Sequence, residues 1–290
     1  MQIACQLALL VPSLGSARVL FRSAAFGISL VALTVTASNR TTKRHPGAVF
    51  VLFILFVLGL EAFHSDTNGP LAALATLAMN SAVLGPLIWA PRLAIDKKWF
   101  RRTVLLFWAF QSTSALVGAL QSYFPNTFQP VTPFLDKQAL AGLTIALANG
   151  ESILRPSGLT DTPGGAAVAG TYAAILSLGL WFEFAKIWQR AIFVFTMAIG
   201  IYTIYLGQVR SLLLMVAISM LVIAGVYAVS GKLRNAVGLT ILVVAIAGGS
   251  FVAAVGIGGD EVTNRFRTLV EGAPSDVYYA NRGRFLEQTV

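Results

Sequence analysis

Tyr205-Leu206-Gly207-Gln208-Val209-Arg210-Ser211 interrupts a long apolar run that extends from Ala191 to Ser230, and Arg210 is the only charged residue of that run. A helix rises about 1.5 Å per residue, so one helix over the whole run would be about 60 Å long, roughly twice the hydrocarbon thickness of a bilayer. Leu206-Gly207-Gln208 is the polar and flexible place for a reversal. The sequence therefore predicts two membrane-spanning helices, 191–206 and 210–230, with one arginine at the tip between them.

Composition extends this prediction to the whole chain. Of the 290 residues, 56% are hydrophobic and 11% are charged, and the mean hydropathy is +0.75. Apolar runs of near-spanning length recur along the sequence, which is typical of a polytopic all-α membrane protein. We predict a transmembrane helical bundle of about eight spans, with a kink at Gly85-Pro86. The predicted spans are 24–38, 47–63, 71–90, 103–120, 165–182, 191–206, 210–230 and 236–257.

The distribution of charge predicts the orientation of these helices. Loops 39–46, 91–102, 183–190 and 231–235 hold twelve of the 21 Lys and Arg residues but two of the 12 acids. Basic loops lie on the cytoplasmic side of membrane proteins, so the net charge of +9 reflects topology and gives no reason to expect a nucleic-acid partner. Four of the five tryptophans fall at the cytoplasmic ends of the spans, as an interfacial aromatic belt would. They are Trp89, Trp99, Trp181 and Trp188.

Two long polar segments are then predicted on the outer face. The loop 121–164 contains a weak helical pattern at 133–148, which we expect to lie at the membrane surface. The tail 258–290 is polar and charged. We therefore divide the chain into a transmembrane domain, residues 1–257 with its loop 121–164, and the beginning of a large outer loop, residues 258–290.

Arginines recur in three outer-face clusters, and a planar guanidinium grips phosphate oxygens in pairs at any pH. Converging arginines at a membrane surface suit a diphosphate whose lipid tail stays in the bilayer, and the glycine-rich start of the helix after Pro163 adds backbone N–H donors. The clusters are Arg155–Gly165 (with Asp161), Gln208–Ser211, and the tail's Arg265, Arg267, Arg282 and Arg284.

Each cluster also has a structural interpretation. Arg210 can mark a helix end that extends to water, Arg155 can be a solvated loop charge, and the tail arginines can contact lipid headgroups. Glu61, His64 and Asp66 lie close together in the sequence, but their spacing fits no established ligand pattern, so we predict no metal site. A single cysteine, Cys5, excludes an internal disulfide in these residues.

Three of these segments resemble the O-antigen ligase and O-antigen polymerase superfamily of bacterial membrane glycosyltransferases. RPSGLTDTPGGAA (155–167) resembles the family's Arg-x-x-Gly-x-x-x-x-Pro segment, which follows a periplasmic loop and opens a membrane helix. GQVRSLLL (207–214) resembles its Ser-Arg motif, with Val209 in place of the serine. NRFRTL (264–269) followed by NRGRF (281–285) resembles the start of its large periplasmic loop. Asp161-Thr162-Pro163-Gly164 departs from the family's asparagine-proline-asparagine-like string.

The resemblance implies a reaction and its participants. An undecaprenyl-diphosphate-linked saccharide would be transferred to a saccharide or lipid A core acceptor at the periplasmic face of the bacterial inner membrane, without a metal or another cofactor. Arg210 and Arg155 would bind the donor diphosphate and stabilise the leaving group. Further substrate contacts would come from Arg282, Arg265, Arg267, Gln208 and Asp161. The general base is expected in a later part of the family's large loop, so we expect this sequence to be a fragment that lacks it.

Two other classes remain open at this point. A transporter or channel usually carries ionisable residues near the centres of its spans, whereas the charges of this sequence lie at span ends and in loops. A non-catalytic subunit of an envelope polysaccharide export or assembly complex is the second alternative. Within the enzyme interpretation, the sequence does not separate a ligase from a polymerase.

Overall fold

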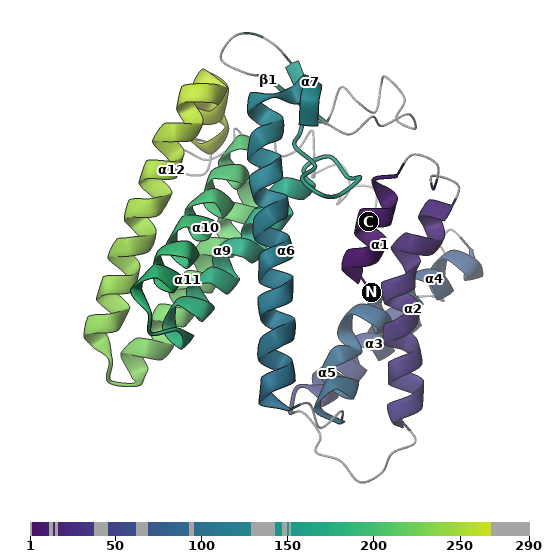
Figure 1. The fold of residues 1–290 in the computed structure, drawn as a ribbon. Coiled ribbons are helices and arrows are strands. Elements are labelled where there is room, and N and C mark those ends of the chain that lie inside the picture. Colours follow the sequence, from purple (N-terminus) through teal and green to yellow (C-terminus); the bar gives the residue numbers. More distant parts are fainter. Residues whose placement is uncertain are drawn as a thin grey trace. The chain divides into compact units, whose positions relative to one another are not determined.

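A computed structural model gives the architecture of the chain (Figure 1). It describes residues 2–11, 14, 17–37, 46–61, 69–92, 96–128, 143–146, 150 and 152–267. The chain divides into two compact units, Met1–Leu105 and Leu106–Val290, which are described separately below.

Long apolar helices dominate the described residues and confirm the prediction of an all-α membrane protein. Five helices have the length and composition to cross a bilayer, and a sixth span results if the bent pair Leu71–Leu84 and Pro86–Arg92 is counted as one. Two more apolar helices, Ser23–Thr36 and Ala48–Leu60, are shorter. Each predicted span thus coincides with a helix, but the predicted number of about eight spans is not confirmed.

The first unit contains helices of up to 20 residues and the beginning of the longer helix α6. Its helices pack through apolar side chains and through a few hydrogen bonds between elements. Ser29 donates to the carbonyl oxygen of Ala82 (2.6 Å), and the indole nitrogen of Trp89 donates to Ser29 (3.1 Å). The helices are α1 (Gln2–Leu9), α2 (Arg18–Ala37), α3 (Ala48–Glu61), α4 (Pro70–Leu84), α5 (Pro86–Trp89), the 3-10 turn η2 (Ala90–Arg92) and the start of α6 (Lys97–Tyr123).

The predicted kink at Gly85-Pro86 is confirmed. The chain bends by 42° between Leu71–Leu84 and Pro86–Arg92. Proline has no N–H for the helical ladder and its ring displaces the preceding turn, which explains the bend at this point. The guanidinium of Arg92 donates to the carbonyl oxygen of Thr36 (2.8 Å), which ties the end of the bent segment to α2.

Four antiparallel helices follow α6 in the second unit, together with a short helix and a two-stranded sheet (Figure 1). The strands are antiparallel, with Ile145 opposite Ile153. Helix α10 ends at Leu206 and α11 begins at Arg210, so the reversal lies where the sequence predicts it. The elements are α7 (Pro125–Phe128), β1 (Thr144–Ala146), β2 (Ser152–Leu154), α9 (Gly165–Glu183), α10 (Ile187–Leu206), α11 (Arg210–Val229) and α12 (Leu233–Arg267).

Glycines allow α9 and α10 to approach with almost no side chain between them. A Cβ atom added to Gly170 would collide with the carbonyl oxygen of Gly200 and with the hydroxyl of Thr203. A Cβ atom added to Gly200 would collide with the carbonyl oxygen of Gly170 and would lie 3.1 Å from the backbone nitrogen of Ala174. In a lipid bilayer no hydrophobic effect drives helices together, and small residues at such crossings allow them to pack closely.

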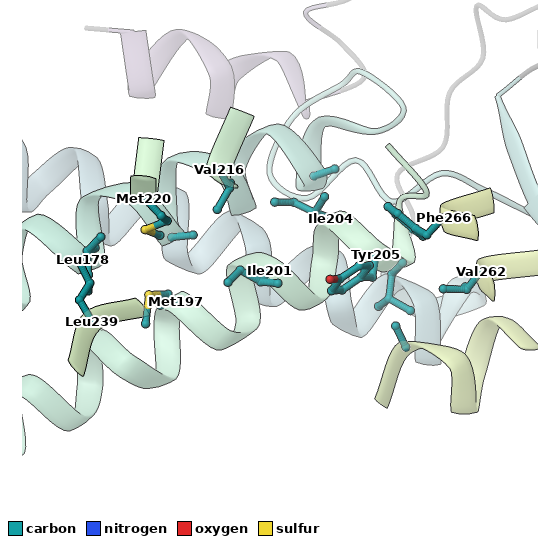
Figure 2. Close-up of a cluster of buried hydrophobic side chains, with 14 residues drawn as sticks. Leu178, Met197, Ile201, Ile204, Tyr205, Val216, Met220, Leu239, Val262 and Phe266 are labelled. Carbon is teal, nitrogen blue, oxygen red and sulfur yellow. The ribbon is translucent and has the colours of Figure 1, made fainter. Parts of the chain in front are cut away.

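The core of the second unit lies among α9, α10, α11 and α12 (Figure 2). It is built from fully or nearly buried apolar side chains, including Met197, Ile201 and Ile204 on α10. Several polar side chains inside the bundle pair with one another, which suits a lipid surrounding. The indole nitrogen of Trp108 donates to Ser177 (2.8 Å), whose hydroxyl also pairs with Thr196 (2.8 Å).

Two predictions about the loops need correction. The predicted helix 133–148 is wrong at its end, where Thr144–Ala146 forms a strand because it pairs with Ser152–Leu154; residues 133–142 and 147–148 lie outside the described part. The last helix does not end at residue 257 but continues to Arg267, with a bend at Gly259 (φ 57°, ψ −148°). The predicted outer loop therefore begins as a helix.

We predict that Gly200→Ala destabilises the second unit by about 1–3 kcal/mol, because the added methyl overpacks the contact with α9. The measurement is thermal unfolding of the detergent-solubilised protein, followed by size-exclusion chromatography. Gly225→Ala is the matched control, since an added Cβ there meets nothing within 4 Å. Equal melting temperatures for the two variants would contradict the close approach.

Candidate functional site

The loop between β2 and α9 closes on itself through its backbone. The N–H of Gly164 donates to the carbonyl oxygen of Arg155 (3.4 Å), and the N–H of Ala166 donates to that of Pro156 (3.2 Å). Gly164 has a left-handed backbone (φ 81°) immediately before α9, whose start at Gly165 confirms the predicted glycine-rich helix start. The loop is therefore an ordered part of the second unit.

Helix α6 holds this loop through one buried glutamine. Gln121 is 1% exposed, and its side-chain amide forms hydrogen bonds with both the N–H and the carbonyl oxygen of Gly158. Its Nε2 donates to the carbonyl oxygen of Gly158 (3.1 Å), and its Oε1 accepts from the N–H of Gly158 (2.8 Å). The same Nε2 also donates to the carbonyl oxygen of Phe128 (3.0 Å). One side chain thus fixes both the loop and the chain that leaves α7.

Two glycines let the loop approach α6 and close before α9. Gly158 has a positive φ of 64°, and a Cβ atom there would lie 2.6 Å from the carbonyl oxygen of Ser114. The hydroxyl of Ser114 accepts from the N–H of Leu159 (3.0 Å). At Gly165, an added Cβ would collide with the hydroxyl of Thr160. A side chain at either glycine would push the loop away from its position.

Arg155 has a partly buried side chain at the start of this loop. Its backbone N–H donates to Leu143 (2.9 Å), which joins the loop to the strand pair. The Nε atom of Arg155 is buried and has no hydrogen-bond partner among the described residues. A buried charged donor without an acceptor costs free energy, and an anionic oxygen would remove that cost.

Asp161 is 8% exposed and lies in the same loop. The hydroxyl of Thr162 donates to its carboxylate (3.3 Å). This hydrogen bond indicates that the carboxylate helps to shape the loop. The contact of Asp161 with substrate stays a prediction.

The turn between α10 and α11 has a tight and unusual backbone. The N–H of Gly207 donates to Thr203 (2.9 Å) and that of Val209 to Ile204 (3.4 Å), so the turn satisfies the carbonyl groups at the end of α10. Gln208 is the described non-glycine residue with a positive φ, 54°, and it is 8% exposed. Arg210 follows as the first residue of α11 and is partly buried.

The end of α12 packs beside this turn through aromatic rings. The ring of Phe266 lies 4.9 Å from that of Tyr205, edge to face (Figure 2). It also lies 6.5 Å from the ring of Phe251, again edge to face. Arg265 and Arg267 flank the buried Phe266 and are exposed. The bend at Gly259 and this aromatic contact therefore hold two arginines close to the end of α10.

Contacts between elements bring the three predicted clusters to one end of the second unit. A Cβ atom added to Gly207 would lie 3.0 Å from that of Ala167, in the first turn of α9, so the α10–α11 turn lies beside the start of α9. Tyr205 and Phe266 join the end of α12 to the same turn. The segments with Arg155, Arg210 and Arg265–Arg267 thus converge. Arg282 and Arg284 lie outside the described residues.

The sequence interpretation missed the residues of α6 that organise this end. Ser114, Gly118 and Gln121 recur at helical spacing on one face: Ser114 and Gln121 bond the loop, and an added Cβ at Gly118 would collide with that of Ala166. The signal was a polar and small stripe at i, i+4 and i+7 inside an otherwise apolar span. The hydroxyls of Tyr123 and Tyr202 also pair across α6 and α10 (2.8 Å).

A metal centre finds no support in the described residues. Within them, no three His, Cys, Asp or Glu side chains are grouped so that they could hold an ion. His64 and Asp66 lie outside the described part.

Comparison with known proteins gave no relative. No protein-family model, no curated protein and no solved structure matches this chain. The functional argument therefore depends on the residues and contacts of the chain itself.

We predict that Gln121→Ala loosens the loop 155–165 and destabilises the protein by about 1–3 kcal/mol, because it removes the partners of two buried backbone groups of Gly158. Hydrogen exchange of the loop amides, measured by mass spectrometry in detergent, should accelerate. Thr113→Ala is the control on the same helix, since its exposed hydroxyl bonds only to Ala109 of its own helix in the described contacts. Unchanged exchange in Gln121→Ala would show that the amide does not hold the loop.

Proposed function

We propose that the protein transfers a saccharide from a polyprenyl-diphosphate carrier, of the undecaprenyl kind, to a saccharide acceptor at the membrane surface, as an O-antigen ligase or polymerase does. The observation that carries the proposal is the buried Nε of Arg155, which lacks an acceptor in the described residues. It lies in a loop fixed beside the turn that precedes Arg210. A diphosphate supplies the acceptor oxygens that such an arginine needs.

The chemistry assigns a role to each arginine. Cleavage of the bond between the sugar and the diphosphate leaves negative charge on the leaving phosphate oxygens. Arg155 and Arg210 would stabilise that charge, and charge stabilisation that grows in the transition state accelerates the reaction. Arg265 and Arg267, which are exposed, would contact the outer part of the substrate. The exposed apolar side chains of α11, such as Leu221 and Val222, face the lipid in which the carrier's tail lies.

Charge distribution in the second unit supports a periplasmic site. Lys186, Arg190, Lys232 and Arg234 all lie at the end of the α9–α12 bundle opposite to the arginine clusters. Basic residues at that end are typical of the cytoplasmic side. The proposed site then lies on the outer side, where lipid-linked saccharides are assembled into surface polymers.

A transporter is less well supported by the same helices. In α9, α10 and α11 the ionisable Asp, Glu, Lys and Arg residues are Glu183, Arg190 and Arg210, each in an end turn. Substrate and ion sites of transporters usually need such groups near the middle of the membrane. We therefore make no second proposal.

Deletion of the gene in its host, with the surface polysaccharide resolved on a silver-stained gel, tests the proposal. Loss of the long ladder with one repeat left on the core would indicate a polymerase. Bare core with accumulated lipid-linked polymer would indicate a ligase. An unchanged ladder, together with unchanged capsule and exopolysaccharide, would contradict the proposal.

We predict that Arg210→Ala abolishes complementation of this deletion while membrane insertion is retained. Arg210→Lys should restore little, because a point charge does not make the paired contacts of a guanidinium. The ladder and the amount of inserted protein are measured in parallel. Arg234→Ala, which removes an exposed arginine from the opposite end of the bundle, should complement fully. A normal ladder from Arg210→Ala would contradict the role of Arg210.

A further inference from the structure

The first six residues of α6, Lys97-Lys98-Trp99-Phe100-Arg101-Arg102, form a surface that the proposed transferase site does not use. All six side chains are exposed, and the two aromatic ones are 64% and 62% exposed. The helix continues from here into an apolar segment long enough to cross a bilayer. This surface, which we name the basic aromatic collar, therefore lies where a spanning helix enters the membrane.

The helix arranges the collar residues on distinct faces. Successive residues of a helix are turned by about 100°, so Lys97, Lys98, Arg101 and Arg102 share an arc of about 140°. Trp99 and Phe100 border that arc on either side. The guanidinium of Arg102 lies over the ring of Trp99, 5.7 Å from its centre. Four cations thus form one face, with an aromatic side chain at each edge.

This arrangement is unfavourable for an isolated helix. Lys97 and Arg101, and likewise Lys98 and Arg102, are like charges four residues apart, which repel each other along the helix. Lys97 and Lys98 also lie in the first turn, at the positive end of the helix dipole, where acidic residues are preferred and where α6 has none. Asp96 is the neighbouring acid before the helix. A negatively charged surface beside the collar would offset both effects.

We propose that the basic aromatic collar binds the headgroups of anionic phospholipids. The cations attract the headgroup phosphates. Clusters of four or more Lys and Arg residues next to a spanning helix are complementary in charge to an anionic leaflet. Trp99 and Phe100 insert at headgroup depth, which accounts for their large exposed area in the protein alone. The collar thereby fixes the depth at which α6 sits in the bilayer. The occupant is a lipid and not a soluble phosphate, because both aromatic edges need an apolar partner.

Native mass spectrometry of the purified full chain in detergent tests the proposal, with phosphatidylglycerol and phosphatidylcholine added in equal amounts. The wild-type protein should retain about fivefold more phosphatidylglycerol or better, since each cation near an anionic surface is worth on the order of a fivefold gain. Equal retention of the two lipids by the wild type would overturn the proposal, whatever the variants do. An excess of inorganic phosphate should leave the preference for phosphatidylglycerol unchanged. If the phosphate abolishes that preference, the collar is a phosphate site and the lipid proposal is wrong.

Two matched variants locate the preference on the collar. K97Q/K98Q/R101Q/R102Q should lose it, whereas the charge-preserving K97R/K98R/R101K/R102K should keep it. Trp99→Ala should lower the retention of both lipids and leave their ratio above one. K232Q/R234Q, in the turn before and the first turn of α12, should behave as the wild type. If K232Q/R234Q loses the preference and the collar variant keeps it, the lipid binds elsewhere and the proposal is wrong.

Discussion

The backbone contact between Gly170 and Gly200 sets the geometry of the second unit. Because neither residue has a side chain, α9 and α10 meet at the distance of their backbones. This close approach places Ala167, one turn before Gly170, against Gly207, which is the first residue after α10. The start of one helix and the end of the next are thereby held together by close packing of backbone and small side chains. In lipid, where burial of apolar surface gives no net gain, such packing is the main source of helix association.

Helix α6 adds a polar constraint to this apolar one. Gln121 and Ser114 provide the hydrogen bonds that the backbone of Gly158 and Leu159 loses when the loop leaves water. If the loop were displaced, these backbone groups would be buried without hydrogen-bond partners, which costs free energy. Their hydrogen bonds to α6 therefore fix the position of the loop. Arg155 enters the loop from the adjoining strand and is carried to this end of the bundle by these contacts. The ordered backbone explains how an arginine in a loop can keep a buried Nε.

Features that depend on local sequence were predictable here, and features that depend on distant contacts were not. The reversal at Gly207 and the bend at Gly85-Pro86 follow from residues that interrupt an apolar run or a helical ladder. The role of Gln121 depends on a partner in another element, and nothing near it in the sequence indicates that partner. The strand at Thr144–Ala146 exists through its pairing with Ser152–Leu154. Hydropathy locates apolar runs but not their helix ends, so α3, with 14 residues, was predicted as a span although it is shorter than the five long helices.

Arg210 and the first two lysines of α6 are cations placed where the helix dipole opposes them. Arg210 is the first residue of α11, and it follows Gln208, whose left-handed backbone adds a strain of about 1 kcal/mol or more for a residue with a side chain. Lys97 and Lys98 begin α6 in the same unfavourable sense. The left-handed backbone of residue 208 favours a glycine, and the helix dipole favours an acidic residue in either first turn. An anion at each place would interact favourably with the side-chain charge and with the positive helix end together. The diphosphate proposed near Arg155 and Arg210 and the lipid headgroups proposed at the α6 collar therefore share this electrostatic argument.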